Sequence, residues 1–496
     1  MSGAHTPAWH AVPDAVEVAG QWRPADIRGL PATLRYGASL SGVALAAARG
    51  RPRKELLVDD LGPLFGSALE AAVDSVAAAV AAAVRQGAGK EIGVCAASHR
   101  GLLAGVTAIG ALGLDCALVP ASAGSEVLAA ALADVDVVLV DDTTVAAVRA
   151  AAPHARAFDV IALAQRSPGR SLRSVPRPRK TGSLRLLTSG TTGTPKTTER
   201  GSAAFGQLAT LLSLMRALDL RRDEPVVVAP PLSHGHGLLV LTAALVVGAP
   251  AALGQGRDGA GLIELIHSHA AGVLAVVPAQ LAMVLDALEA EEAAGAPGSG
   301  LGSLRRIATG SAPLSAELAE RTHRLLGEQL VDFYGSSEAG TATIATPEDL
   351  RDAPGTVGRP AAGVRIEIVD GEGTPLPAGE VGQVRITSPW RATSVTEQEV
   401  EVGDLGHLDE SGRLFVHGRS DGVVVVGGHN VSIMRVHDWF VAQPGVSTAV
   451  VQVLPHPELG HELSVEVTGE ADPADLAARA LEELGSAAAP RRVERV

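Results

Sequence analysis

The chain of 496 residues contains little cysteine and little lysine. Cys95 and Cys116 are its only thiols, and two thiols in so long a chain form neither a disulfide framework nor a zinc site. This scarcity is typical of a reducing compartment, so we expect a cytoplasmic protein. Lysine occurs only at positions 54, 90, 180 and 196, so every later basic side chain is an arginine or a histidine.

Long hydrophobic runs are also lacking. The most apolar stretches, residues 76–84 and 238–247, are shorter than the roughly 20 residues that a membrane-spanning helix needs. The first 23 residues show no basic segment followed by an apolar core, which argues against a signal peptide. We therefore expect no membrane span.

The charge balance is acidic, with a formal net charge of -14. An acidic surface repels phosphate backbones, so we expect no nucleic-acid partner. The hydrophobic share of 46% is ordinary for a globular protein, and the length predicts two or more domains.

Strand and helix patterns alternate after about residue 55, which predicts parallel sheets covered by helices. The expected strands are 55–59, 91–96, 116–119, 135–140, 184–187 and 225–229, and the expected helices are 61–85, 99–113, 125–133, 206–218 and 237–247. Residues 1–50 are expected to be irregular, and the Pro- and Arg-rich segment 166–180 to be a loop.

Shorter alternating runs follow at 364–369, 382–386 and 413–416, and these predict antiparallel strands. Asp409-Glu-Ser-Gly412 is typical of a hairpin turn. A small α+β unit is expected from about residue 420.

One loop carries the strongest chemical signal, the run Leu187-Thr-Ser-Gly-Thr-Thr-Gly-Thr-Pro-Lys196 after an apolar strand. Gly190 and Gly193 permit close backbone approach, and successive N–H groups in such a loop form an anion-binding nest. Lys196 adds a positive charge that a phosphate can use. A flexible surface loop is the structural alternative, but the Pro-Lys ending makes the run more specific than that.

This run resembles the signature loop of the adenylate-forming superfamily, which includes acyl- and aryl-CoA synthetases, luciferases and peptide-synthetase adenylation domains. The resemblance implies that the loop grips the β- and γ-phosphates of ATP. The implied contacts are Thr188, Ser189, Gly190, Thr191, Thr192, Gly193 and Lys196.

Further motifs follow in the family's order. Pro231-Leu-Ser-His-Gly-His-Gly237 resembles the element whose histidine lines the acid pocket, which implies this role for His234. His236 occupies a position that the family leaves open. A structural histidine is the alternative for both residues.

Two turns resemble the family's adenine-binding elements. Thr309-Gly-Ser-Ala-Pro-Leu314 implies that Gly310, Ser311 and Ala312 border the adenine and the acid, although it could equally start a helix at Ser315. Phe333-Tyr-Gly-Ser-Ser-Glu338 implies that Tyr334 stacks on adenine, that Gly335 and Ser337 approach the nucleotide, and that Glu338 binds Mg²⁺. Both aromatic rings could instead belong to the core.

Val402-Gly-Asp-Leu-Gly406 and the Gly-Arg-Ser-Asp ending at 421 resemble the ribose-binding and hinge elements. They imply Asp404 on the ribose hydroxyls, Arg419 on ribose or phosphate, and Asp421 as a hinge. The implied domains are 1–418, which binds AMP, and 419–496, a lid. Asp404 and Arg419 could alternatively form a mere surface pair.

The C-terminal unit departs from the family pattern. Val425 and Arg435 stand where a lysine and a glutamate are usual, and no lysine follows Lys196. The family's last element normally supplies a lysine that bridges the acid and the α-phosphate. Three explanations stay open: Arg491, Arg492 or Arg495 replaces it, the substrate needs less help, or the protein binds nucleotide without efficient turnover.

The resemblance implies an α/β fold with a large N-terminal domain of parallel α/β subdomains, a small β-barrel and an α+β lid. It implies an ATP- and Mg²⁺-dependent ligase that converts a small acid to an acyl-adenylate and passes it to a thiol, coenzyme A or a carrier protein. One alternative is an amine acceptor, in an amide ligase or in a diazotase that uses nitrite and an aromatic amine. Another is a nucleotide-binding protein without ligase activity.

Overall fold

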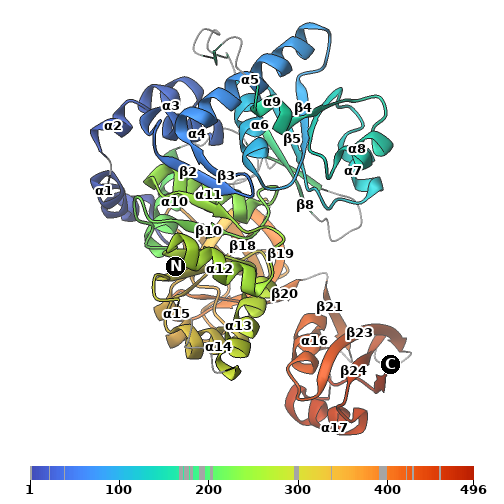
Figure 1. Cartoon of the computed structure of the whole chain (residues 1–496). Helices are drawn as coiled ribbons and strands as arrows, with labels where there is room; N and C mark the ends of the chain where they lie inside the picture. Colours follow the sequence, from blue (N-terminus) through green and yellow to red (C-terminus); the bar gives the residue numbers. More distant parts are fainter. Residues whose placement is uncertain are drawn as a thin grey trace.

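Figure 1 shows the computed structural model of the chain, in which two α/β regions lie against each other and a small C-terminal unit stands apart. The structure describes all residues except 1–2, 22, 38, 167–170, 173–177, 179–181, 189–195, 201–204, 295–300, 337, 390–398, 420–421, 427–428, 457–459 and 487.

The first α/β region is built on a six-stranded sheet with the order β7-β6-β4-β5-β8-β9. Its strands are β4 (Glu91–Cys95), β5 (Asp115–Val119), β6 (Val137–Val140), β7 (Arg156–Asp159), β8 (Leu184–Thr188) and β9 (Lys196–Arg200). All pairs are parallel except β8 with β9. The helices of this region are α5 (Gly66–Arg85), α6 (Arg100–Ala111), α7 (Ser125–Ala131), α8 (Val145–Ala151) and α9 (Val160–Ala164).

The second α/β region is built on a nine-stranded sheet with the order β16-β15-β14-β13-β12-β10-β11-β2-β3. Its strands are β2 (Glu55–Asp59), β3 (Gly62–Phe65), β10 (Val226–Val228), β11 (Ala251–Leu253), β12 (Val273–Ala275), β13 (Arg306–Gly310), β14 (Leu330–Ser336), β15 (Gly340–Ala345) and β16 (Arg359–Pro360). The six consecutive strands from β14 to β2 in this order are parallel, and the central β10, β11 and β12 are continuous apolar runs because helices cover both faces of the sheet.

The helices of this second region are α10 (Phe205–Ala217), α11 (Gly235–Val247), α12 (Gly259–His269), α13 (Pro278–Ala293), α14 (Ala316–Leu326) and α15 (Pro347–Asp352). Side chains alternate between the two faces of each strand. Ala308, Val331 and Phe333 belong to the large core cluster that includes α11, whereas Ile307 and Leu330 belong to a separate cluster with α12 and α13.

An open antiparallel sheet follows, with the order β1-β17-β18-β19-β20. Its strands are β1 (Ala4–His5), β17 (Arg365–Val369), β18 (Gly382–Thr387), β19 (Glu399–Leu408) and β20 (Leu414–Arg419). The predicted turn at 409–412 closes the β19–β20 hairpin, with the Gly412 N–H donating to the Asp409 carbonyl. Within the described residues β1 and β20 do not pair, so the expected small barrel is a half-barrel.

The C-terminal unit forms a sheet of its own and has a separate hydrophobic core cluster. It contains β21 (Val423–Val426), β22 (His429–Ser432), α16 (Ile433–Val441), β23 (Val446–His456), β24 (Gly460–Gly469), α17 (Pro473–Leu484) and β25 (Arg492–Arg495). The Ser432 hydroxyl donates to the His417 carbonyl of β20 at 2.8 Å, which fastens the unit to the half-barrel sheet.

The expectation that residues 1–50 are irregular is wrong. They form α1 (Val12–Gly20), α2 (Pro24–Ile27), α3 (Leu30–Tyr36) and α4 (Leu40–Gly50), besides β1 and a short 3-10 helix at Ala8–Ala11. The prolines in the first turns of α1 and α3 begin these helices rather than break them. Ser39 caps α4 by accepting the Gly42 N–H.

The helix expected at 61–85 begins only at Gly66, because residues 62–65 form β3. This helix, α5, is long and apolar enough to cross a membrane by length and composition. Half of its apolar window is buried, and α5 packs against α4, α6 and α9. The core therefore accounts for its composition.

Candidate active site

Three predicted motifs follow parallel strands at the carboxyl edge of the nine-stranded sheet, in which β14 and β13 are neighbours and β12 separates β13 from β10. The segment 231–237 follows β10, the turn at 310–312 ends β13, and residues 334–338 end β14. Ligands of open α/β sheets bind at this edge, because the loops that leave the strands converge there. The fold therefore brings the segment 231–237 to the same edge as two segments that lie more than 70 residues further along the sequence.

Tyr334 and Asp404 are joined by a hydrogen bond across two sheets. The Tyr334 hydroxyl donates to Asp404 Oδ2 at 2.5 Å. Tyr334 lies on β14, whereas Asp404 lies on β19 opposite Arg419 in the β19–β20 register. The bond thus fixes the half-barrel sheet against the carboxyl edge. The Arg419 side chain lies outside the described part of the chain.

The two glycines of the adenine motifs are required by strand packing. A Cβ at Gly335 would lie 2.0 Å from the Gly340 carbonyl oxygen, and one at Gly310 would lie 2.8 Å from the carbonyl oxygen of Phe333. Ser311 has a φ of +68°, which is uncommon for a residue with a side chain. Ser311 and Ala312 are exposed beyond the end of β13.

The buried pair Thr309 and Asp332 was not predicted. The Thr309 hydroxyl donates to Asp332 Oδ1 at 2.5 Å, and burial raises the pKa of Asp332 to about 6. Both side chains face away from Phe333, on the α12–α13 side of the sheet, by the alternation of β14. Asp332 is therefore next to Phe333 along the strand but on the opposite face of the sheet.

His234 and His236 differ sharply in their surroundings. His234 is the exposed N-cap residue of α11, and its side chain accepts no N–H of the first turn. His236 is 7% exposed and lies edge-on to Phe333, with ring centroids 5.9 Å apart. Burial lowers the pKa of His236 to about 4, so the ring is neutral at pH 7.

Glu338 is half-buried in the turn between β14 and β15. The Ala339 N–H donates to Ser336 Oγ at 3.0 Å, which holds the turn. Within the described residues no group of three or more His, Cys, Asp or Glu side chains could hold a metal ion. One carboxylate fits Mg²⁺, since that ion commonly takes one or two protein carboxylates and completes its shell with phosphate oxygens and water.

The phosphate-loop prediction falls mostly outside the described residues. Thr188 and Lys196 are the last pair of the β8–β9 hairpin, next to the residues that connect the two strands. The predicted contacts Ser189, Gly190, Thr191, Thr192 and Gly193 lie outside the described residues, as do Ser337, the hinge residue Asp421 and the side chains of Thr188 and Lys196.

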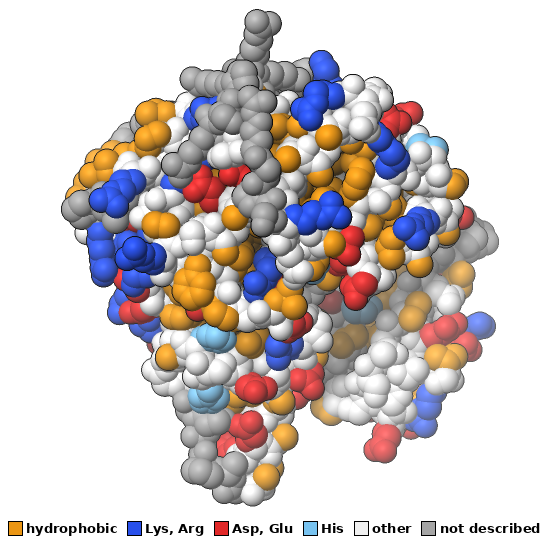
Figure 2. Space-filling model, turned by 45° about the horizontal axis from the view of Figure 1, so that its top comes forward, with side chains coloured by type: hydrophobic (Ala, Val, Ile, Leu, Met, Phe, Trp, Pro, Cys, Tyr) orange, Lys and Arg blue, Asp and Glu red, His pale blue; other side chains and the backbone are white. Residues whose placement is uncertain are grey.

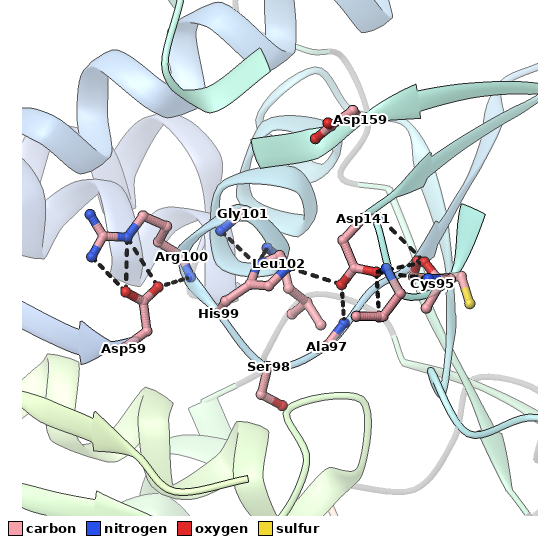
Figure 3. A network of polar contacts seen from close by, with 12 residues as sticks. Asp59, Cys95, Ala97, Ser98, His99, Arg100, Gly101, Leu102, Asp141 and Asp159 are labelled. Atoms are coloured by element: carbon pink, nitrogen blue, oxygen red, sulfur yellow. Dashed lines mark hydrogen bonds and ion pairs between the residues drawn. The ribbon is translucent and has the colours of Figure 1, made fainter. Parts of the chain in front are cut away.

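A dense polar network lies at the carboxyl edge of the six-stranded sheet (Figure 3). Asp141 Oδ2 accepts the Ala97 N–H and the His99 Nε2–H, and Asp141 Oδ1 accepts hydrogen bonds from Thr143 and Thr144. His99 Nδ1 accepts the Gly101 and Leu102 N–H groups at the start of α6. Both ring nitrogens of His99 are thus used.

Ser98 connects this network to the candidate site. Its hydroxyl accepts the N–H of Leu232 at 2.8 Å, two residues before His234. On the other side, Arg100 binds Asp59 of β2 through its side chain and its backbone N–H. The turn between β4 and α6 therefore ties the two sheets together at their carboxyl edges.

The C-terminal arginines have different surroundings. Arg495 donates to the Glu470 and Ala471 carbonyls, so its guanidinium is engaged within the C-terminal unit. Arg491 and Arg492 are more than half exposed and lie 3.8 Å from Glu462 and 3.6 Å from Glu494. Of the three, Arg495 is the least free to reach a ligand.

Charges of both signs are interspersed on the face shown in Figure 2, where no broad basic field gathers among the coloured residues. The same view shows a hollow between the C-terminal unit and the main body.

Comparisons with known proteins agree with this geometry. A family model described as AMP-binding enzyme matches residues 45–394. A fatty acid–[acyl-carrier-protein] ligase of Streptomyces coeruleorubidus is 28% identical over 330 residues, and the match covers 62% of each chain. An indoleacetate–CoA ligase of Aromatoleum aromaticum is 30% identical over 302 residues, covering 57% of each chain. These alignments thus span about 60% of the length of the curated relatives.

Solved structures show the same fold over nearly the whole chain. An amide bond synthetase from Marinactinospora thermotolerans matches with a TM-score of 0.76 and 24% identity, covering 92% of this chain and 96% of that one. The o-succinylbenzoate CoA synthetase of Bacillus subtilis, in complex with an acyl-adenylate, matches with a TM-score of 0.79 and 20% identity, covering 92% and 94%. The predicted fold class is confirmed.

Proposed function

Because this chain belongs to the AMP-binding enzyme family, we propose that it is an ATP-dependent ligase that joins a small acid to AMP and releases pyrophosphate. An oxygen of the acid attacks the α-phosphorus of ATP. A new O–P bond forms, and the bond between the α-phosphorus and the bridging oxygen breaks, with pyrophosphate as the leaving group. The scarcity of cysteine favours a cytoplasmic enzyme.

The chain's own residues divide into three groups. Lys196, Thr192 and the glycines of the 188–196 loop hold the β- and γ-phosphates, and Glu338 holds Mg²⁺, which neutralises phosphate charge. Tyr334, Asp404 and Arg419 hold the nucleoside, with Gly310, Ser311, Ala312, Gly335 and Ser337 beside it. His234 borders the acid. Each assignment carries the family's role onto the matching position.

The bond between Tyr334 and Asp404 is the observation that carries the proposal. The two residues lie 70 positions apart and were assigned to the same nucleoside from separate motifs. A nucleoside site needs a ring to stack on the base and a carboxylate to accept the ribose hydroxyls. Their contact at the carboxyl edge of the sheet supports a common ligand for both.

We propose a thiol, either coenzyme A or a carrier protein, as the acceptor of the second half-reaction. Curated relatives described as CoA and acyl-carrier-protein ligases support this choice. The second candidate is an amine, because Val425 and Arg435 depart from the family pattern in the C-terminal unit. In both cases residues 1–418 form the AMP-binding domain, and residues 419–496 form a lid that turns near Asp421.

Because no lysine follows Lys196, any cation that the C-terminal unit of this sequence brings to the α-phosphate is an arginine or a protonated histidine. We propose Arg491 or Arg492, since Arg495 is held by two carbonyls. Removing one such electrostatic donor typically lowers kcat by about 10²- to 10³-fold.

A pyrophosphate-release assay with MgATP tests the first half-reaction. The acids would be fatty acids, aryl acids, amino acids and nitrite, each with coenzyme A, with an aromatic amine, or with neither. Lys196→Ala should abolish release, whereas Lys90→Ala, an exposed lysine on the surface, should leave it unchanged. Equal release by wild type and Lys196→Ala would refute the assignment of the loop.

The same assay separates the acceptors. A thioester that forms only with coenzyme A supports the thiol. Turnover that requires an amine and ignores coenzyme A supports the second candidate. ATP binding by calorimetry without turnover on any acid would leave a nucleotide-binding protein as the remaining account.

A further inference from the structure

Two histidines of the half-barrel sheet lie directly against each other, next to the C-terminal unit. Nδ1 of His407 on β19 is 2.8 Å from Nε2 of His417 on β20, and the two ring planes are 11° apart. This distance is that of a hydrogen bond, in which one ring donates its N–H and the other accepts. The neutral pair can take up one further proton at an outer nitrogen without losing this bond.

A β-bulge places His417 on this side of the hairpin. In the β19–β20 register Leu405 pairs with Gly418, whereas Gly406 pairs with Val416, so His417 is the extra residue on its strand. A bulge of this kind bends the strand and redirects a side chain. The histidine pair therefore lies on the last part of the half-barrel sheet before the C-terminal unit begins.

The first turn of α16 packs on His417 from the C-terminal unit. Ser432, the N-cap residue of α16, donates its hydroxyl to the His417 carbonyl at 2.8 Å and accepts the Arg435 N–H at 3.3 Å. Gly418 permits this approach, since a Cβ there would lie 2.9 Å from Ser432 Oγ. One hydroxyl thus joins the strand that carries the histidine to the helix that carries Arg435.

Among the described residues, the charged groups that act on His417 are cationic or can become so. β19 contributes His407, and α16 contributes Arg435 together with the positive end of its helix dipole. β22 also carries His429, whose side chain lies outside the described part of the chain. Burial, His407 and Arg435 all lower the pKa of His417, and no described carboxylate offsets them. A proton on the histidine pair therefore places like charges on the two sides of the junction.

Only part of this environment would change if the C-terminal unit turned. His407 and His417 both belong to the half-barrel sheet and would stay together, whereas Arg435, the helix dipole and the burial by α16 would be lost. The histidine pair would therefore bind a proton more readily in the turned orientation. By linkage, a pH that falls below 6.5, the ordinary pKa of histidine, favours the orientation that binds more protons.

We infer that the His407–His417 pair is a pH-sensitive contact that controls the orientation of the C-terminal unit. The neutral pair keeps α16 against β20, and acid releases α16 because the protonated pair repels Arg435. The inference rests on the proposed function only in taking residues 419–496 as a lid that turns near Asp421. It adds a regulation of that movement.

Single-molecule fluorescence energy transfer tests this coupling on the full chain. Dyes on Glu380→Cys and Glu482→Cys report the orientation, because Glu380 is exposed on the half-barrel side and Glu482 is exposed on α17, while Cys95 and Cys116 are buried and stay unlabelled. One transfer efficiency should dominate at pH 7.5 and a second should grow at pH 5.5. We expect the equilibrium constant between the two to change by about 5- to 10-fold.

Variants at the junction should change this response in different directions. Arg435→Glu should reverse it, because a protonated histidine pair would then face a carboxylate and acid would favour the docked orientation. Arg435→Gln should reduce the response, and His407→Gln combined with His417→Gln should abolish it. His437→Gln is the matched control: this histidine lies on the same helix, contacts Asp438 at 3.0 Å and should leave the response of wild type unchanged.

Identical distributions at pH 7.5 and pH 5.5 in the labelled wild type would overturn the inference. A response of unchanged direction in Arg435→Glu would overturn it as well. If circular dichroism shows that Arg435→Glu does not fold, Arg435→Gln decides: a response smaller than that of wild type supports the inference, and an equal one refutes it.

The measurement needs neither ATP nor an acid, so it is independent of turnover. A normal pH response in a protein that releases no pyrophosphate would refute the proposed function alone. Normal release of pyrophosphate without a pH response would refute the inference alone.

Discussion

The carboxyl edges of the two parallel sheets are built alike but use their polar side chains differently. At the six-stranded sheet, Asp141 accepts hydrogen bonds from both sides of its carboxylate, and His99 uses both ring nitrogens (Figure 3). At the nine-stranded sheet, His236 is buried without a partner among the described residues, and Asp332 has one side-chain partner, Thr309.

We call the carboxyl edge of the six-stranded sheet the structural edge and that of the nine-stranded sheet the binding edge. A network whose members are all paired stabilises the fold and has little left to offer a ligand. Buried polar groups that lack partners destabilise the free protein, and a ligand that pairs them recovers that free energy. Variants at the first edge should therefore affect mainly stability, whereas variants at the second should affect mainly ligands and the pH dependence of stability.

Asp141→Ala should have the largest effect on stability. It removes the acceptor for Ala97, His99, Thr143 and Thr144 together, and we expect a loss of about 3–5 kcal/mol in the unfolding free energy at pH 7. Urea denaturation followed by circular dichroism measures this loss. Asp142→Ala is the matched control, because its side chain is exposed. A loss no greater than that of the control would show that the network is not structural.

The pH dependence of stability should reveal His236 at the other edge. Its folded pKa of about 4 lies below the ordinary value of 6.5, so the unfolded chain takes up the proton first as the pH falls. The unfolding free energy therefore has its full contribution from the neutral His236 ring above pH 6.5, and this contribution declines as the pH falls below 6.5. Between pH 7 and pH 5 we expect wild type to lose about 2 kcal/mol more than His236→Phe does.

In this comparison of wild type with His236→Phe, the contributions of the other titrating groups to the pH dependence of stability cancel, because both proteins share those groups. Parallel curves for the two proteins between pH 7 and pH 5 would mean that water or another group pairs the ring in solution.

The six strands predicted between residues 55 and 229 are present, because parallel strands buried on both faces are continuously hydrophobic. The strands β3, β7 and β9 and the helices α8 and α9 were not predicted, and neither was any strand or helix between residues 250 and 310. The first 50 residues could not be predicted as well, since the prolines that begin α1 and α3 suggest a loop when no packing partner is known.

The candidate site was predicted unevenly, for a physical reason. Tyr334 and Asp404 were recognised within local motifs, but their contact depends on how two sheets pack. The unpaired state of His236, the Asp332–Thr309 pair and the Ser98 link to Leu232 are consequences of tertiary packing and leave no mark in local spacing.

Asp332→Asn should stabilise the protein at pH 7 by about 1–2 kcal/mol. Burial raises the folded pKa of Asp332 to about 6, so the folded state holds its proton longer than the unfolded state, and a penalty grows as the pH rises through 4 to 6. Asparagine removes the charge and keeps an acceptor for Thr309. The gain should be nearly complete at about pH 7 and absent below about pH 3, where both states hold the proton, and a gain independent of pH would contradict this account.

Ser98→Ala tests the connection between the two edges and should have the smallest effect. The variant leaves the buried Leu232 without a side-chain partner for its N–H, and we expect a loss of about 1 kcal/mol in the unfolding free energy. Ser98→Thr keeps the hydroxyl and is the control. Leu232 lies two residues before His234. If the hydrogen bond from Leu232 to Ser98 positions His234, the KM for the acid should be higher in Ser98→Ala, with the KM for ATP unchanged. A loss of stability without any change in KM for the acid would show that the structural edge does not position the residues of the binding edge.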